Sequence, residues 1–241
     1  MEPDRGTWEC GDHARLLAST YVSPKLTLFG LDLTNLNSMG LGKTMQVITL
    51  LVAIAEAAVS TDPKISGQIP GGLKVSRTLV LSPPGLINNW MDELLTWIPD
   101  DMLGTLNPTK VDASIKIPQR LDRIEDWYLD GGVLVMGYEM FRALIENKTV
   151  KGREASLLTE EEHVQIQKHL LEGPNIVIAD EAHKMKNATT GITISASKFR
   201  SKSRIALTGS PLANNVEEYH TMIEWVSQNY LGKLPASPCY L

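Results

Sequence analysis

The chain has 241 residues, enough for one large domain or two small ones. Its hydrophobic content of 43% and charged content of 21% are ordinary for a globular protein, and its net charge of −5 argues against a surface that is basic throughout. The two cysteines, Cys10 and Cys239, have no metal-ligand spacing and indicate no disulfide framework, so a reducing compartment is expected. The longest apolar stretch, residues 47–59, is shorter than the roughly 20 residues that a membrane span needs, so no membrane partner is expected.

Residues 1–38 show no clear periodicity and are interpreted as a poorly defined lead-in. They are followed at residues 40–44 by a glycine-rich turn, Gly-Leu-Gly-Lys-Thr. In a phosphate-binding loop, glycines such as Gly40 and Gly42 let backbone N–H groups close around phosphate oxygens. The full pattern G-x-x-x-x-G-K-T requires a glycine where this chain has Asn37, so a chance occurrence in a turn is the alternative interpretation.

Four later segments share one pattern, a short apolar run followed by polar or turn residues. Such a run is typical of a parallel strand that is buried on both faces. In an open α/β sheet, the residues that follow these strands lie at the edge where ligands bind. The four predicted strands are residues 78–81, 133–136, 176–179 and 205–207.

Helical patterns lie before and between these predicted strands. Thr159 and Glu162 form a capping box, which predicts the start of one helix. The alternation of strands and helices predicts an α/β fold with a mostly parallel sheet and helices on both faces. The predicted helices are residues 43–59, 86–97, 119–129, 160–171 and 216–230, and the predicted loops are residues 60–77 and 148–156.

The third predicted strand ends in Asp180 and Glu181, which begin an Asp-Glu-Ala-His sequence, or DEAH box. Two adjacent acids at a strand end are the usual way in which an NTPase holds Mg²⁺ and polarises the attacking water. Lys43 is predicted to contact the β and γ phosphates of a nucleoside triphosphate, and Thr44 and Asp180 are predicted to hold Mg²⁺. Glu181 is predicted to orient or deprotonate the attacking water. The alternative is that Lys43 and Thr44 mark only an exposed helix start.

Other segments give weaker signals. The Thr-Gly-Ser-Pro sequence at residues 208–211 is a turn when taken alone, but its place after a strand makes it a candidate coupling loop. Trp90 and Trp97 have helical spacing, which favours core or interface packing over base stacking. Lys184 and Lys186 are candidate phosphate contacts, with a solvated surface as the equally weighted alternative.

Four blocks of sequence resemble the SWI/SNF-related helicase-like ATPases, which are chromatin remodellers and DNA translocases of helicase superfamily two. They are Met-Gly-Leu-Gly-Lys-Thr-Met-Gln at residues 39–46, Leu-Ser-Pro-Pro-Gly-Leu-Ile-Asn-Asn-Trp at 81–90, Asp-Glu-Ala-His-Lys-Met-Lys-Asn at 180–187 and Leu-Thr-Gly-Ser-Pro-Leu-Ala-Asn-Asn at 207–215. Residues 137–142 and 217–232 also look like this family, in its ATRX-like branch. Four linked motifs in the same order make the resemblance specific.

The resemblance implies a RecA-like P-loop NTPase lobe at residues 39–232 that uses ATP and Mg²⁺, followed by a tail at residues 233–241. It implies action in the nucleus on double-stranded DNA or nucleosomes, with a second RecA-like lobe or a remodelling complex as partner. The residues implied to bind the nucleotide are Met39, Gly40, Leu41, Gly42, Lys43, Thr44 and Gln46. The residues implied to lie near DNA or to couple ATP to DNA are Ser82, Pro83, Tyr138, Glu139, Thr208 and Ser210, beside the candidates Lys184 and Lys186.

The chain departs from the family pattern in three ways. Asn37 and Ser38 stand where the family carries Asp-Glu, and no glutamine motif that reads adenine is found before residue 39. The residues after position 232 leave no room for the second RecA-like lobe, whose arginines complete the ATP site in the family. The expected protein is therefore a first lobe with slow or undetectable turnover alone. The alternatives are a non-catalytic nucleotide- or DNA-binding regulatory module and a degraded copy that folds poorly.

Overall fold

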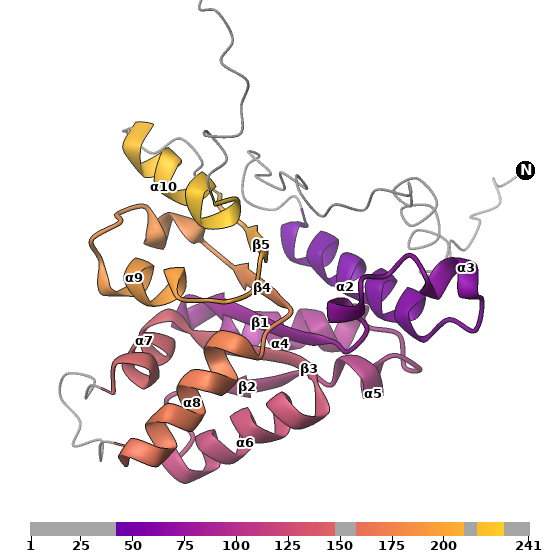
Figure 1. The fold of residues 1–241 in the computed structure, drawn as a ribbon, viewed down its shortest axis with the longest axis horizontal. Helices are drawn as coiled ribbons and strands as arrows, with labels where there is room; N and C mark the ends of the chain where they lie inside the picture. The colour runs from indigo at the N-terminus through magenta and orange to yellow at the C-terminus, as the bar shows by residue number, and fades with distance from the viewer. Residues whose placement is uncertain (1–41, 148–157, 210–215, 229–241) are drawn as a thin grey trace, which may run out of the picture.

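The computed structural model describes residues 42–147, 158–209 and 216–228 (Figure 1). Within these ranges, five strands form one sheet in the order β2-β3-β1-β4-β5. All neighbouring strands are parallel, so each connection returns over a face of the sheet. The strands are β1 (Arg77–Ser82), β2 (Thr109–Val111), β3 (Gly132–Gly137), β4 (Ile176–Ala179) and β5 (Ser203–Ala206).

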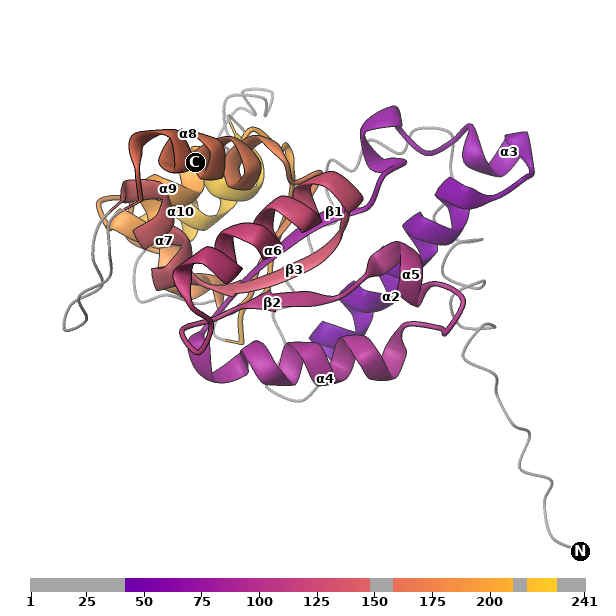
Figure 2. The ribbon, with the colours of Figure 1, turned by 90° about the horizontal axis from the view of Figure 1, so that it is seen from below.

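Helices cover both faces of the sheet, which gives three layers (Figure 1, Figure 2). One face carries α2 (Lys43–Val59), α4 (Ile87–Trp97) and the short α5 (Leu103–Leu106). The other face carries α6 (Ile117–Asp130), α7 (Tyr138–Glu146), α8 (Glu160–Glu172), α9 (Gly191–Ser197) and α10 (Val216–Val226). Short turns in the connections are α3 (Pro63–Ser66), η1 (Gly71–Leu73), η2 (Pro84–Leu86) and η3 (Ala182–Met185).

The core is divided by the sheet because side chains along each strand alternate between its faces. Leu79 and Leu81 of β1 pack on the side of α6 to α10, whereas Val80 packs on the side of α2 and α4. On β4, Val177 packs on the side of α6 to α10 and Ile178 packs on the side of α2 and α4. All five of these strand side chains are fully buried. The predicted mostly parallel sheet with helices on both faces is therefore confirmed.

The four predicted strands and the helices at 43–59, 86–97, 119–129 and 160–171 are confirmed, with ends that shift by one or two residues. The helix predicted at 216–230 ends earlier, at Val226. The loop prediction for residues 60–77 is partly wrong, since α3 and η1 lie there. The strand β2 and the helices α5, α7 and α9 were not predicted. Residues 1–41, 148–157, 210–215 and 229–241, with the predictions made for them, lie outside the described ranges.

Two hydrogen bonds join the residue that follows α7 to the second residue before α8. Asn147 Nδ2 donates to the Leu158 carbonyl oxygen at 3.1 Å, and the Leu158 N–H donates to Asn147 Oδ1 at 3.0 Å. Asn147 has a left-handed backbone, with φ 48°, which asparagine adopts more readily than most residues. This pair, the Asn147–Leu158 clasp, holds the two helices together on either side of residues 148–157.

A buried arginine ties α10 to β5. The Arg204 guanidinium donates to three main-chain carbonyl oxygens: Ser201 at 2.9 Å, Trp225 at 3.0 Å and Phe199 at 2.6 Å. Its carbon also lies 5.5 Å from the centre of the Trp225 ring. Burial lowers the pKa of Arg204, and the three carbonyl oxygens compensate the guanidinium for lost water.

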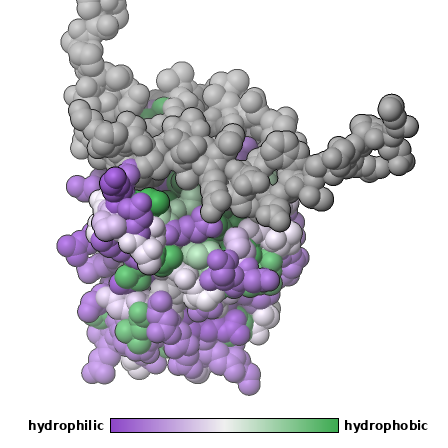
Figure 3. Space-filling view, turned by 90° about the vertical axis from the view of Figure 1, so that its right-hand side faces the viewer, coloured by the Kyte–Doolittle hydropathy of each residue, from purple (hydrophilic) through white to green (hydrophobic). Residues whose placement is uncertain are grey.

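The described surface is mixed in polarity. Figure 3 shows hydrophobic side chains scattered among polar ones on the described part of one face. Among the described residues, no helix is long and apolar enough to cross a membrane.

The capping box at the start of α8 gives a stability prediction. Thr159 Oγ1 accepts the Glu162 N–H at 3.3 Å, and Glu162 Oε2 accepts the Thr159 N–H at 2.8 Å. We expect Thr159→Ala to lower the free energy of unfolding by about 1 kcal/mol, because the Glu162 N–H loses its acceptor and the Glu162 carboxylate loses the Thr159 hydroxyl as a donor. Urea unfolding measures this change. Thr61→Ala, at an exposed loop position, is the control, and an equal loss in both variants would contradict the prediction.

Candidate nucleotide and magnesium site

The first residues of α2 lie toward the carboxyl ends of the strands. The later half of the helix lines a small cavity beside the beginnings of β1 and β4, through Leu51 and Ala55 next to Arg77 and Ile176. A helix rises about 1.5 Å per residue, so Lys43 is about 12 Å further along from Leu51. α2 therefore runs back along the sheet and directs its N-terminus to the edge where β4 ends in Asp180.

The start of α2 has the local features of an anion-binding helix end. Gly42 precedes the helix with φ 68° and ψ 29°, a left-handed conformation that glycine adopts without strain. No side chain caps this end among the described residues, and the first turn contains no acid. The first N–H groups of a helix lack intrahelical partners, and they carry a partial positive charge. Lys43 and Thr44, both half-buried, begin this turn and add a cation and a hydroxyl.

The Asp180 carboxylate is buried, with 9% of the residue exposed, and its oxygens accept hydrogen bonds from three groups. Asp180 Oδ2 accepts the Trp90 indole N–H at 2.9 Å and the Ser82 hydroxyl at 3.4 Å. Asp180 Oδ1 accepts the Glu181 main-chain N–H at 2.9 Å. Burial raises the pKa of Asp180, and the hydrogen bond from Trp90 is the largest effect in the opposite direction.

The main chain of Asp180 is held as firmly as its side chain. The Tyr138 hydroxyl donates to the Asp180 carbonyl oxygen at 2.7 Å, and the Asp180 N–H donates to the Leu81 carbonyl oxygen at 2.8 Å. Tyr138 is 1% exposed, and this burial raises the pKa of its phenol. Asp180 therefore has a fixed position at the end of β4.

Glu181 turns the chain away from the sheet. Its backbone is left-handed, with φ 50° and ψ 50°, and it precedes η3. A residue other than glycine in this region carries strain of roughly 1–3 kcal/mol, which is frequent at functional sites. Its Oε2 lies 3.1 Å from His183 Nδ1, and both side chains are partly exposed. Glu181 is thus open to solvent while Asp180 is not.

Three of the residues implied to lie near DNA or to couple ATP to DNA are buried. Ser82, Tyr138 and Thr208 are 0%, 1% and 3% exposed, so in this structure their own side chains do not lie at the surface. Ser82 and Tyr138 instead bond Asp180, because α4 and α7 close over the strand ends that precede them.

The other predicted site residues differ in how much of their side chain is exposed. Glu139, Lys184 and Lys186 are exposed, and Pro83 is half-buried. Glu139 lies 3.4 Å from Arg142 in an ion pair within α7. Gln46 is exposed in the first turn of α2. The residues Met39, Gly40, Leu41 and Ser210 lie outside the described ranges.

Trp90 is the site residue that sequence reasoning missed. The prediction of core packing is confirmed, since Trp90 is 2% exposed, but its hydrogen bond to Asp180 was not expected. The available signal was its position as the last residue of the 81–90 block, one of the four that carry the family resemblance. Trp97, by contrast, is half-buried and donates to Glu93 Oε2 within α4 at 2.5 Å.

A comparison with known protein families shows to which family this chain belongs. The family described as "SNF2-related domain" matches residues 36–236. The chain belongs to the SNF2-related domain family. The expected resemblance to SWI/SNF-related proteins is therefore confirmed.

Several curated relatives carry a segment similar to this SNF2-related domain. It is 34% identical over 195 residues to "Transcriptional regulator ATRX homolog" of Drosophila melanogaster, covering 80% of this chain and 14% of that protein. It is 34% identical over 201 residues to "Transcriptional regulator ATRX" of Homo sapiens, covering 81% and 7%. It is 33% identical over 208 residues to "Protein CHROMATIN REMODELING 20" of Arabidopsis thaliana, covering 86% and 12%. The matched segment thus spans 7–14% of these relatives' own length.

Among solved structures, the "Sulfolobus solfataricus SWI2/SNF2 ATPase core in complex with dsDNA" is similar to this SNF2-related domain. The TM-score is 0.47 and the sequence identity is 22%, with coverage of 78% of this chain and 30% of that chain.

The buried carboxylate of this SNF2-related domain gives a pH prediction. Because burial raises the pKa of Asp180 above its ordinary 3.8, the unfolded state loses this proton at a lower pH than the folded state. The wild type should therefore lose stability relative to Asp180→Asn as the pH rises from about 3.8 through the raised pKa. Urea unfolding of both proteins in magnesium-free buffer, between acidic and neutral pH, measures the difference. A difference that stays constant, or that moves the other way, would show that the folded-state pKa is not raised.

Proposed function

We propose that this chain is the ATP-binding first RecA-like lobe of a DNA-dependent ATPase of the SWI/SNF-related remodelling type. The observation that carries the proposal is the placement of two motifs at one edge of a parallel sheet. The uncapped start of α2, with Lys43 and Thr44, is directed to the edge where β4 presents Asp180 and Glu181. Family membership supports the same conclusion.

The residues present fit a magnesium–nucleotide complex. Mg²⁺ prefers oxygen ligands and is usually held by one or two carboxylates together with substrate phosphates. Within the described residues there is no group of three or more histidine, cysteine, aspartate or glutamate side chains that would form a complete metal cage. Thr44 and Asp180 would hold the ion, which neutralises charge on the phosphates, and the phosphates would complete its coordination.

Each protein group then has a defined task. The first N–H groups of α2, which have no partner within the helix, and the Lys43 ammonium would bind the phosphates. Gly40, from the glycine-rich motif, and Met39 and Leu41, from the family resemblance, remain proposed members of the phosphate-binding loop. Gln46, just after the loop in α2, remains a proposed nucleotide-binding residue from the resemblance alone. Glu181 would orient or deprotonate the attacking water, and its partial exposure leaves its carboxylate accessible to that water.

Double-stranded DNA, free or in nucleosomes, is the proposed partner, and the nucleus is the proposed location. Support comes from the family and from relatives named as transcriptional regulators or for chromatin remodelling. Lys184 and Lys186 are exposed immediately after the Asp180–Glu181 pair, which places two cations next to the proposed ATP site.

Rapid turnover is proposed to need a second RecA-like lobe in the same assembly. In related phosphoryl-transfer enzymes, an arginine supplied from outside the nucleotide-binding domain contributes about 10³- to 10⁵-fold in rate. The described residues form a single sheet that would supply one half of such a site. We therefore expect the isolated chain to bind ATP but to hydrolyse it slowly.

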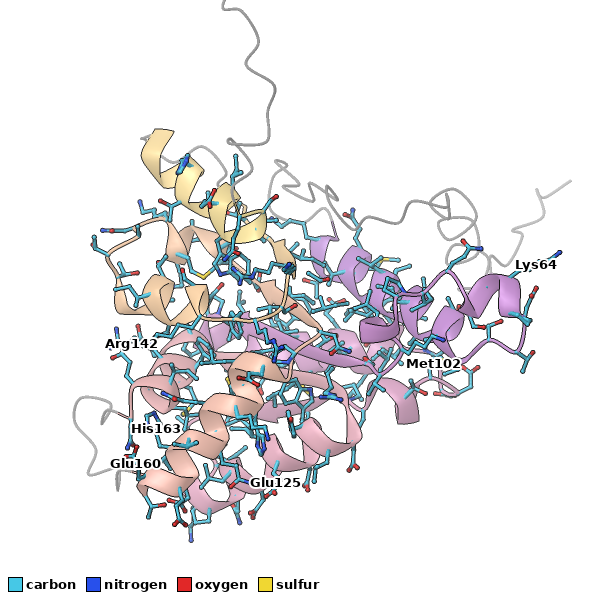
Figure 4. All side chains as sticks on the ribbon, in the orientation of Figure 1. Lys64, Met102, Glu125, Arg142, Glu160 and His163 are labelled. Carbon is cyan, nitrogen blue, oxygen red and sulfur yellow. The ribbon has the colours of Figure 1, made fainter. Side chains whose placement is uncertain are left out.

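Calorimetry of Mg²⁺–ATP binding tests the nucleotide site. We expect saturable binding by the wild type and loss of binding, by about tenfold or more, in Lys43→Ala, because a charge-assisted contact to phosphate is removed. Lys64→Ala is the matched control, since this exposed lysine projects from α3 at the end of the molecule away from β4 and β5 (Figure 4). Absence of binding by the wild type, or equal loss in both variants, would refute the nucleotide site.

Hydrolysis separates a catalytic lobe from the alternative, a non-catalytic regulatory module. DNA-stimulated ATP hydrolysis that Glu181→Gln abolishes would support the catalytic role. ATP binding without any DNA-stimulated turnover, even with a second lobe supplied, would favour the regulatory module.

Salt dependence tests the DNA partner. Each phosphate of a B-DNA duplex that a lysine neutralises contributes about −0.9 to the slope of log K against log salt concentration. Replacing Lys184 and Lys186 by glutamine should therefore make the slope of duplex binding shallower by roughly 1–2. Fluorescence anisotropy at several salt concentrations measures it, with Lys64→Gln as control. An unchanged slope would remove these two lysines from the DNA interface.

A further inference from the structure

The closest side-chain donor to the Asp180 carboxylate is a tryptophan that lies 90 residues earlier in the chain. The Trp90 indole N–H reaches Asp180 Oδ2 at 2.9 Å, whereas the Ser82 hydroxyl is at 3.4 Å. Trp90 is 2% exposed and Asp180 is 9% exposed, so water offers little competition for this bond. A hydrogen bond to a buried carboxylate is about twice as strong as one between neutral groups.

The two oxygens of the Asp180 carboxylate accept different numbers of hydrogen bonds. Each carboxylate oxygen has two acceptor positions. Asp180 Oδ2 accepts Trp90 and, at a longer 3.4 Å, the Ser82 hydroxyl, which lies equally far from the Pro83 carbonyl oxygen; Oδ1 accepts only the Glu181 N–H among the described residues. The carboxylate is therefore fixed in rotation, and Oδ1 is the oxygen that keeps a position for a further partner.

We propose that Trp90 is a positioning residue of the magnesium site, whose indole N–H orients the Asp180 carboxylate so that Oδ1 faces the ion or a water bound to it. The inference rests on the proposed nucleotide function. The indole N–H is a donor only, so Trp90 acts through Asp180 and never as a ligand. Groups that orient a metal ligand in this way commonly change metal affinity about 10- to 100-fold when they are replaced.

A purely structural role for Trp90 is the alternative, and the chain contains a matched control for it. Trp127 of α6 is also 2% exposed, and its indole N–H donates to the Gly132 carbonyl oxygen at 3.1 Å. This bond lies at the first residue of β3, the opposite end of the sheet from Asp180. Trp90→Phe and Trp127→Phe each remove one buried indole N–H bond and similar ring volume, but only Trp90→Phe releases Asp180.

The test compares ATP binding with Mg²⁺ and with EDTA for the wild type and both variants, by calorimetry. We expect Trp90→Phe to reduce the Mg²⁺-dependent gain in affinity by about tenfold or more, and to leave binding in EDTA unchanged. Trp127→Phe should keep the wild-type gain. Thermal unfolding of both variants shows whether each remains folded.

A second measurement uses the wild type, so it does not depend on how well a variant folds. The chain has five tryptophans, whose indole N–H groups give separate proton–nitrogen NMR signals. When Mn²⁺ replaces Mg²⁺ in the ATP complex, the Trp90 signal should broaden at lower Mn²⁺ concentration than the Trp127 signal.

Each outcome decides the proposal. A Mg²⁺-dependent gain that is lost in Trp90→Phe and kept in Trp127→Phe supports it, as does selective broadening of the Trp90 signal. A wild-type gain that Trp90→Phe retains, or equal broadening of both signals, overturns the positioning role but leaves the proposed function intact. Absence of ATP binding by the wild type, in either buffer, overturns both.

Discussion

A buried carboxylate is costly unless hydrogen bonds replace its lost water, and Asp180 at the end of β4 is such a group. The structure meets this requirement with donors from several elements: the Trp90 indole from α4, the Ser82 hydroxyl from β1 and the Glu181 N–H. The Tyr138 hydroxyl at the start of α7 holds the carbonyl oxygen of the same residue. Helices from both faces of the sheet therefore each donate a hydrogen bond to one aspartate.

The hydrogen bonds to Asp180 give a structural role to the ends of β1 and β3 and the residues that follow them. The family resemblance implies that both segments lie near DNA, yet Ser82 and Tyr138 point inward to Asp180. A displacement of α4 or α7 would therefore move or break the buried hydrogen bonds that position Asp180. Such direct bonds are a physical route by which a partner on the outer surface of these helices and a ligand at Asp180 would influence each other.

Much of this architecture could be predicted because its strands are continuous apolar runs and its longer helices have clear periodicity or caps, as at Thr159. β2 was missed because its three residues, with Lys110 at the centre, form no apolar run. α7 was missed because Tyr138 begins it directly after β3, without a side-chain cap. In the site, Asp180 and Glu181 were found from local sequence. The bond from Trp90 was not, because no local pattern shows which buried tryptophan meets an aspartate 90 residues away.

The Asn147–Leu158 clasp has a consequence for how the chain tolerates change. Two hydrogen bonds join the residues on either side of positions 148–157, so they link the end of α7 directly to the start of α8. The closure entropy of a loop grows only slowly with its length. A reporter peptide inserted between these two anchors should therefore disturb the edge of the sheet at Asp180 little. This makes the segment a rational place to attach a label to the protein.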